Sequence, residues 1–134
     1  MNWLAIALGG ALGAMLRYAI VAHWVPIPEN RFPTGTLLAN YLGCFAIGVA
    51  YVAIVDKNLL SSQLFGTQLL GTQWRAFIIT GLLGALTTFS AFALEAVQLW
   101  QGGSGLIALS YIAASVLGCL LLTWLALSIT NHLL

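Results

Sequence analysis

The stretch GLLGALTTFSAF, residues 81–92, lies inside a long apolar run and still contains two glycines, two threonines and a serine. The glycines weaken a helix, and the hydroxyls of Thr87, Thr88 and Ser90 can hydrogen-bond locally in competition with the helical backbone. Inside a bilayer, non-helical backbone is tolerated only where protein buries it or where it lines a cavity. We therefore predict a helix that is broken near its middle, whose freed carbonyls are good ligands for a dehydrated cation.

The composition indicates that this chain is embedded in a lipid bilayer. Of its 134 residues, 61% are hydrophobic and 5% are charged, a balance that a water-soluble domain of this size cannot carry. A helix needs about 20 apolar residues to cross a hydrocarbon core of about 30 Å. Four runs reach that length. They predict an all-α membrane protein with a single domain over residues 1–134 and spans at about 3–25, 36–55, 76–100 and 105–129.

Three connections join these spans. The first, PIPENRFPTG, holds all three prolines and predicts a tight polar turn that neither helix can enter. The second, residues 56–75, contains a near-tandem repeat, LFGTQ followed by LLGTQ, and is interpreted as a segment at the membrane interface and not as a fifth span. The third, QGGSG, is short and flexible, so the last two helices are expected to be antiparallel neighbours.

Lysine and arginine are almost balanced across the membrane. Lys57 and Arg75 fall on one side and Arg31 on the other, while Arg17 lies within the first span. An excess of these residues in cytoplasmic loops normally fixes orientation. The balance has two interpretations: a small protein simply has few charges, or copies insert both ways and pair as an antiparallel, dual-topology homodimer. We favour the dimer, because it would also supply an interior for the polar residues of the spans.

Phe89, Phe92 and Glu95 recur every three residues after the predicted break and therefore share one helix face. A phenylalanine pair in a membrane helix usually only packs. Here the rings flank Ser90, and an aromatic edge carries positive quadrupole charge. Rings presented edge-on can therefore attract an anion without supplying a full counter-charge that would trap it.

Two polar stripes repeat at intervals of four residues. On the second span, Asn40 lies between Thr36 and Cys44, and its amide offers two N–H donors to a buried anion or simply bonds a neighbouring helix. Both cysteines of the chain are interpreted as small hydrophobes, with neither a disulfide nor a metal site expected between them. The second stripe, on the fourth span, either bonds preceding carbonyls or forms a hydrogen-bonding track, and it consists of Tyr111, Ser115, Cys119 and Thr123.

The first span combines a small-residue face with one charge. Gly9 and Gly13 are four residues apart and predict close helix packing. Arg17 either snorkels toward the headgroups or neutralises helix-end carbonyls or a vestibule. The sequence contains no Ser-His-Asp set, paired carboxylates, phosphate-binding loop or His/Cys cluster with metal spacing. Neither an enzyme nor a nucleic-acid partner is expected.

Three motifs in order along the chain, GGALGAMLRY, PTGTLLANYLGCFAIG and GLLGALTTFSAF, resemble the bacterial CrcB/Fluc fluoride channel family. With the stripe of the fourth span, the resemblance covers nearly the whole chain. It implies a multi-pass protein of the bacterial inner (plasma) membrane that exports cytoplasmic fluoride passively. It also implies an antiparallel homodimer with two fluoride pores and a central structural sodium ion, Na⁺, bound by the carbonyls of Gly84 and Thr87.

The resemblance further assigns roles to side chains. Asn40 corresponds to the pore amide, and Phe89 with Phe92 to the aromatic pair whose edges face the ion. Arg17 and Glu95 are expected in a vestibule or in a structural role. The remaining lining of the fluoride pathway is expected from Thr36, Thr88, Ser90, Tyr111 and Ser115.

The sequence departs from the family pattern at three places. Ala91 replaces a usual threonine, Cys119 stands where serine or threonine is common, and the connection 56–75 is longer than usual. The first departure removes any role for a hydroxyl at position 91.

Two other functions fit parts of the sequence. A small dual-topology, proton-coupled multidrug exporter needs an intramembrane carboxylate, and Glu95 is the only one within a predicted span. Such exporters carry that glutamate in the first helix, where this chain has none. A non-transporting membrane scaffold subunit would need only the small-residue faces. It leaves the broken span, Asn40 and the phenylalanine pair without a role.

Overall fold

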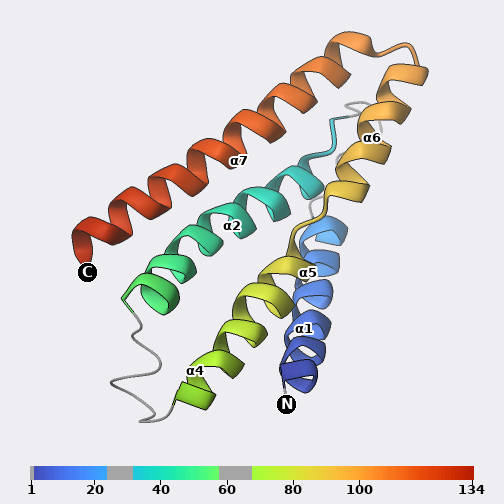
Figure 1. The fold of residues 1–134 in the computed structure, drawn as a ribbon. Helices are drawn as coiled ribbons and strands as arrows, with labels where there is room; N and C mark the ends of the chain where they lie inside the picture. Colours follow the sequence, from blue (N-terminus) through green and yellow to red (C-terminus); the bar gives the residue numbers. More distant parts are fainter. Residues whose placement is uncertain (1, 24–31, 58–67) are drawn as a thin grey trace.

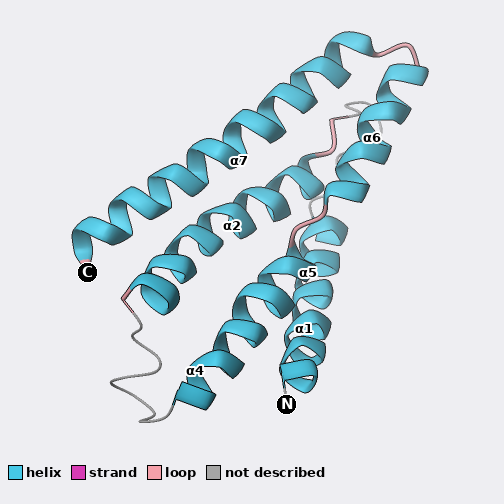
Figure 2. Cartoon of the chain, in the orientation of Figure 1, coloured by secondary structure: helices cyan, strands magenta, loops and turns pink. Residues whose placement is uncertain are grey.

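The computed structural model describes residues 2–23, 32–57 and 68–134, and in this part of the chain every regular element is a helix (Figure 1, Figure 2). Four helical segments are long and apolar enough to cross a membrane: Asn2–His23, Thr34–Asp56, Gly71–Gln101 and Gly105–Leu133. The prediction of four membrane-spanning helices is therefore confirmed. Most of the proline-rich turn and most of the first LFGTQ copy lie outside the described residues.

The first two spans are α1, Asn2–His23, and α2, Thr34–Ala50. Pro33 directly precedes α2 with φ −77°, a value that its ring favours and that suits the start of a helix. The π-helical segment η1, Tyr51–Asp56, continues α2 and ends the second span. α1 and α2 pack against each other.

The third span consists of four helical pieces: α4, Gln68–Arg75; η2, Ala76–Leu83; α5, Gly84–Leu86; and α6, Phe89–Gln101. The last eight residues of the connection 56–75 are helical, because α4 runs directly into η2. The glutamines and glycine that suggested a loop are compatible with a helix end that packs against α1 and η1.

The last two spans form a helical hairpin. α6 ends at Gln101, and α7 runs from Gly105 to Leu133. Gly103 has a φ of 78°, a left-handed conformation that glycine adopts at little cost, so the chain can reverse within the QGGSG segment. α6 and α7 pack against each other as antiparallel neighbours, as predicted (Figure 1).

Small residues allow α1 to approach the third span closely. A Cβ atom on Gly9 would collide with the carbonyl oxygen of Phe77, and one on Gly81 would lie 2.8 Å from the carbonyl oxygen of Ile6. The predicted small-residue packing of the first span is therefore confirmed. Gly81 serves this contact and does not mark the helix break.

We expect Gly13→Ala to destabilise the protein by about 1–3 kcal/mol, since overpacking forces the backbone to shift. The new Cβ would overlap the carbonyl oxygen of Leu82 and lie 3.1 Å from Cβ of Ala85. Gly10→Ala is the matched control, because a Cβ at Gly10 meets nothing within 4 Å. Thermal melting of both variants in detergent checks this, and equal melting temperatures would contradict the packing argument.

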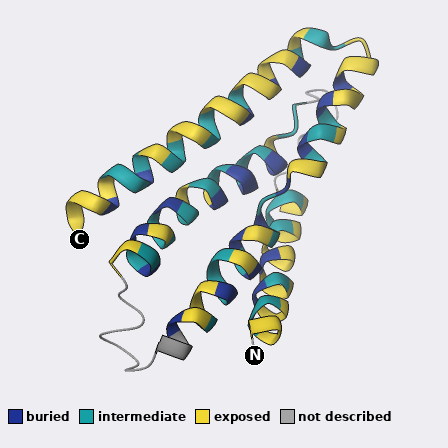
Figure 3. Ribbon diagram, viewed as in Figure 1, coloured by how far each residue is buried: buried dark blue, intermediate teal, exposed yellow. Residues whose placement is uncertain are grey.

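Exposed residues follow the outward faces of the helices (Figure 3), and many of them are large and hydrophobic. Trp3, Leu106 and Leu117 are among the large exposed hydrophobic residues on α1 and α7. Lipid tails solvate such faces at no cost. The small buried cluster lies instead between α6 and α7, where Phe92, Leu99 and Tyr111 pack together.

Candidate functional site

The third span breaks at Thr87 and Thr88. Both residues are extended, with φ and ψ of −83° and 154° for Thr87 and of −150° and 115° for Thr88. The helix restarts at Phe89, where the Thr88 hydroxyl accepts a hydrogen bond from the N–H of Ala91, 3.2 Å away. The predicted broken helix is confirmed, and the threonine hydroxyl caps the new helix as its chemistry suggested.

Asn40 on α2 holds the broken backbone. Its Oδ1 accepts a hydrogen bond from the Thr88 N–H at 2.8 Å, and its Nδ2 donates to the Thr88 carbonyl at 3.2 Å. The amide thus replaces the helical partners that Thr88 lacks in an extended conformation. Only one of its two Nδ2–H bonds is used in this pair, so the second remains available as a donor.

The diverted hydrogen bonds free two carbonyls. In a continuous helix the N–H of Thr88 would donate to Gly84 and that of Ala91 to Thr87. Here the first donates to Asn40 and the second to the Thr88 hydroxyl. Gly84 is exposed, and a Cβ built on it would come no closer to any neighbour than 3.6 Å. These two carbonyls are therefore the kind of oxygen that a hard cation binds.

A glycine on α2 brings Asn40 to the break. A Cβ on Gly43 would collide with the methyl group of Thr87, so only glycine allows α2 this close to the extended residues. The Thr87 hydroxyl donates to the Leu83 carbonyl at 3.1 Å, which directs the methyl group toward Gly43. Gly43 is thus a positioning residue for Asn40, and it was not among the site residues predicted from the sequence.

A cavity of about 330 Å³, called the central groove here, lies beside the break. The rings of Phe89 and Phe92 are 5.4 Å apart at an angle of 51°. Phe92 is buried, whereas Phe89 is 78% exposed. The groove is lined by Asn40, Cys44, Thr87, Thr88, Phe89, Phe92, Ser115, Val116, Cys119 and Leu120.

The hydroxyl of Ser115 is the one polar side-chain atom, within the described part of the chain, that is buried without a hydrogen-bond partner. Ser115 is 5% exposed and lines the central groove. A buried hydroxyl without a partner costs about 1–3 kcal/mol, so it is poised to bond something that enters the groove.

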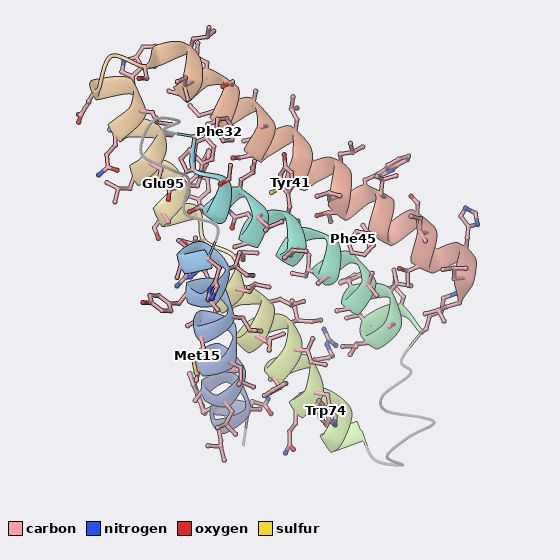
Figure 4. All side chains as sticks on the ribbon, turned by 180° about the vertical axis from the view of Figure 1, so that it is seen from behind. Met15, Phe32, Tyr41, Phe45, Trp74 and Glu95 are labelled. Carbon is pink, nitrogen blue, oxygen red and sulfur yellow. The ribbon has the colours of Figure 1, made fainter. Side chains whose placement is uncertain are left out.

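A second cavity, of about 490 Å³, contains Arg17 and Glu95 and is called the Arg17–Glu95 cavity here. Both oxygens of Glu95 accept hydrogen bonds of 2.7 Å, one from the Thr36 hydroxyl and one from the Tyr111 hydroxyl. Figure 4 labels Glu95 on α6 and Phe32 just before the start of α2. The other residues around this cavity include Tyr18, Thr88, Ser90, Ala91 and Leu94.

Tyr111 contacts one lining residue of each cavity. It is fully buried, and its ring lies 5.5 Å from Phe92 and 5.4 Å from Phe32, the latter at an angle of 84°. Its hydroxyl bonds Glu95 in one cavity, while Phe92 lines the other. Tyr111 itself lines neither cavity, whereas Thr88 lines both, so the broken backbone is what the two cavities share.

The structure places the residues expected along the pathway around these two adjacent cavities, except Tyr111, which is buried and lines neither. Asn40, Thr88, Phe89, Phe92 and Ser115 line the central groove. Thr36 and Ser90 lie with Arg17 and Glu95 around the second cavity. Sequence reasoning missed that Cys44 and Cys119 face the central groove together, although each was placed on a polar stripe. The spacing of four residues was the signal that could have included them.

Comparison with known proteins gives consistent matches. Residues 4–127 match the family described as CrcB-like protein, Camphor Resistance (CrcB). The chain is 44% identical over 131 residues to a protein of Saccharophagus degradans named Fluoride-specific ion channel FluC, covering 98% of this chain and 90% of that protein. It is also 44% identical over 129 residues to a Hahella chejuensis protein of the same name, covering 96% of this chain and 94% of the relative.

Proposed function

The chain belongs to the CrcB-like protein family, and we propose from this premise that it is a fluoride-specific channel through which the ion crosses the membrane passively. Its four apolar spans make it a multi-pass bacterial membrane protein, and a channel is not an enzyme. We assign it to the inner membrane, where it would export cytoplasmic fluoride.

The central groove is the observation that carries this proposal. It presents an amide, hydroxyls and aromatic rings, but no side chain with a full positive charge. Fluoride is small and tightly hydrated, so a pore must replace its water with donors and still bind the ion weakly enough to release it. The spare N–H of Asn40, the partnerless Ser115 hydroxyl and the edges of Phe89 and Phe92 meet both requirements.

The contacts of Glu95 favour a channel over a proton-coupled exporter. Both of its carboxylate oxygens accept short hydrogen bonds from hydroxyl groups. A carboxylate that alternately binds a proton and an organic cation has to exchange partners, and these contacts hold it in one arrangement. We infer a supporting role for Glu95, which keeps Tyr111 and Thr36 in place beside the pathway.

We also propose that two copies pair in antiparallel orientation and form two pores. Phe89 is 78% exposed although it lines the groove, so the groove lacks a wall that a second subunit would supply. Gly84 is exposed beside the break, where a partner could approach its backbone. The near balance of lysine and arginine across the membrane supports insertion in both orientations.

A sodium ion fits the same arrangement. The carbonyls of Gly84 and Thr87 have lost their helical donors, and uncharged carbonyl oxygens are suitable ligands for a hard cation. We propose that these carbonyls hold Na⁺ between the subunits. When bound, the ion would add fixed positive charge near the pores without lying in either.

Efflux from liposomes tests the main proposal. Vesicles loaded with fluoride and containing the purified protein are diluted into fluoride-free buffer, with valinomycin to carry the countercharge, and efflux is followed with a fluoride electrode. We expect fast fluoride efflux and no efflux from chloride-loaded vesicles. Equal release of fluoride and chloride would contradict selectivity. Absence of fluoride efflux from properly assembled protein would contradict a passive fluoride channel.

Dual topology makes a separate prediction. A reporter fused to the C-terminus should be found on both faces of the inner membrane in comparable amounts, because the positive-inside signal is almost balanced. A matched control with several lysines appended after Leu134 should shift the population toward one orientation. A native protein found in one orientation only would rule out the antiparallel dimer.

A further inference from the structure

The two cysteines of the chain lie at the contact between α2 and α7. Cys44 on α2 and Cys119 on α7 line the same groove, and the hydroxyl of Thr123, one helical turn after Cys119, donates to the Cys44 carbonyl at 3.1 Å. A second hydrogen bond, from the Tyr41 hydroxyl to the Ala114 carbonyl at 2.7 Å, fixes the same two helices. The thiol pair is therefore part of a well-defined helix contact.

The pair also faces open space. Both cysteines line the central groove, and neither is in a disulfide. Ser115 lies one helical turn before Cys119, and its buried hydroxyl has no hydrogen-bond partner among the described residues. Two soft sulfur atoms and one buried hydroxyl without a partner thus belong to residues that line the same cavity.

We propose that Cys44 and Cys119 form a binding site for a soft, thiophilic cation of the Hg²⁺ class, which both sulfur atoms bridge. Thiolates prefer soft metal ions. No group of three or more His, Cys, Asp or Glu side chains suited to a metal occurs in residues 2–23, 32–57 and 68–134, which argues against a tetrahedral zinc site. An ion that is satisfied by two sulfur ligands fits the pair.

The reaction balances without an oxidant. Two S–H bonds break, two S–Hg bonds form, and both protons leave to water, so one Hg²⁺ replaces two H⁺. The bridged product, two thiolates with one divalent ion, carries no net charge. Burial at membrane depth therefore avoids the desolvation cost that an isolated ion would incur.

Bound metal would block the pathway. The ion would occupy the groove beside Ser115 and remove the space that an anion needs to pass Phe92. This consequence rests on the proposed channel function, whereas binding itself does not. The two are measured separately for that reason.

Binding is measured first, on the purified protein in detergent titrated with HgCl₂. The ultraviolet charge-transfer band of the Hg–thiolate complex should reach its plateau at one Hg²⁺ per chain, and intact mass should show one Hg gained and two protons lost. Cys44→Ser and Cys119→Ser should each need about tenfold or more Hg²⁺ for half-saturation, because the second sulfur no longer binds intramolecularly. A plateau at two ions per chain, or single variants as sensitive as the parent protein, would overturn the site.

Flux is measured next, with each protein's rate after HgCl₂ divided by its own rate before addition. The parent protein should lose fluoride efflux at one Hg²⁺ per chain and recover it with a dithiol chelator. The double variant Cys44→Ser/Cys119→Ser should keep its own rate at that concentration. Stoichiometric binding without loss of flux would overturn the block, and absence of flux before any metal is added would count against the proposed function alone.

Discussion

Replacing Asn40 by aspartate should lower fluoride efflux by about 100-fold or more, which corresponds to about 2.7 kcal/mol at the transition state. The substitution keeps the size of the side chain but puts a negative charge beside the path of an anion. Asn40 Nδ2 also donates to the Thr88 carbonyl at 3.2 Å, and an aspartate oxygen cannot replace that donor. Efflux from liposomes, at equal amounts of assembled protein, measures the loss.

The charge is the larger of these two effects. Two unit charges 4 Å apart repel by about 4 kcal/mol at an effective dielectric constant of about 20. The lost hydrogen bond to Thr88 is worth about 1 kcal/mol. The other half of the contact survives, because a carboxylate oxygen still accepts from the Thr88 N–H. We therefore expect a folded protein whose defect lies mainly in conduction.

Two comparisons make the Asn40 experiment decisive. Asn131→Asp is the matched control, since Asn131 is exposed near the end of α7, and it should retain the parent rate. Asn40→Ala removes both hydrogen bonds without adding charge and should lie between the parent and Asn40→Asp. Efflux from Asn40→Asp equal to that from Asn131→Asp would remove Asn40 from the pathway.

The spans could be predicted because bilayer thickness fixes their length, and Leu, Ile, Ala and Val dominate each run. The break could also be predicted, because adjacent threonines and a serine compete with helical hydrogen bonds wherever they occur. The exact residues of the break could not be predicted. The glycines and hydroxyls that weaken the helix are spread over residues 81–90, and the choice of Thr87 and Thr88 depends on Asn40, which lies 48 residues earlier in the chain. Long-range contacts of this kind leave no local pattern.

Long-range contacts also limit what the polar stripes could predict. The spacing places Cys44 on one face of α2 and Cys119 on one face of α7, but it does not predict which faces of the two helices are in contact. The close approach at Gly118, where a Cβ would collide with the Tyr41 hydroxyl, sets the register between these helices. That register places both cysteines at the central groove. The helical end at residues 68–75 was missed because glutamine and glycine are as common in connections as at helix ends that leave the hydrocarbon core.

Phe92→Ile should reduce fluoride efflux by about tenfold or more, which is about 1.4 kcal/mol at the transition state. Isoleucine keeps an apolar side chain but has no aromatic quadrupole, so the positive ring edge that would attract an anion is lost. Phe92 also lies 5.5 Å from the ring of Tyr111, whose hydroxyl bonds Glu95, and the substitution loosens both neighbours. Phe89→Ile should act in the same direction, because its ring is 5.4 Å from that of Phe92 in the groove.

A packing defect would imitate this result, so the control has to remove a ring elsewhere. Phe45 on α2 is 41% exposed and does not line the central groove, and Figure 4 shows it further along α2 than Tyr41. Phe45→Ile therefore loses an aromatic side chain without touching the pathway, and it should conduct at nearly the parent rate. Melting temperature in detergent separates stability from conduction for all three variants. If Phe92→Ile and Phe45→Ile conduct equally well, the phenylalanine pair only packs, and the groove would have to attract fluoride through Asn40 and Ser115 alone.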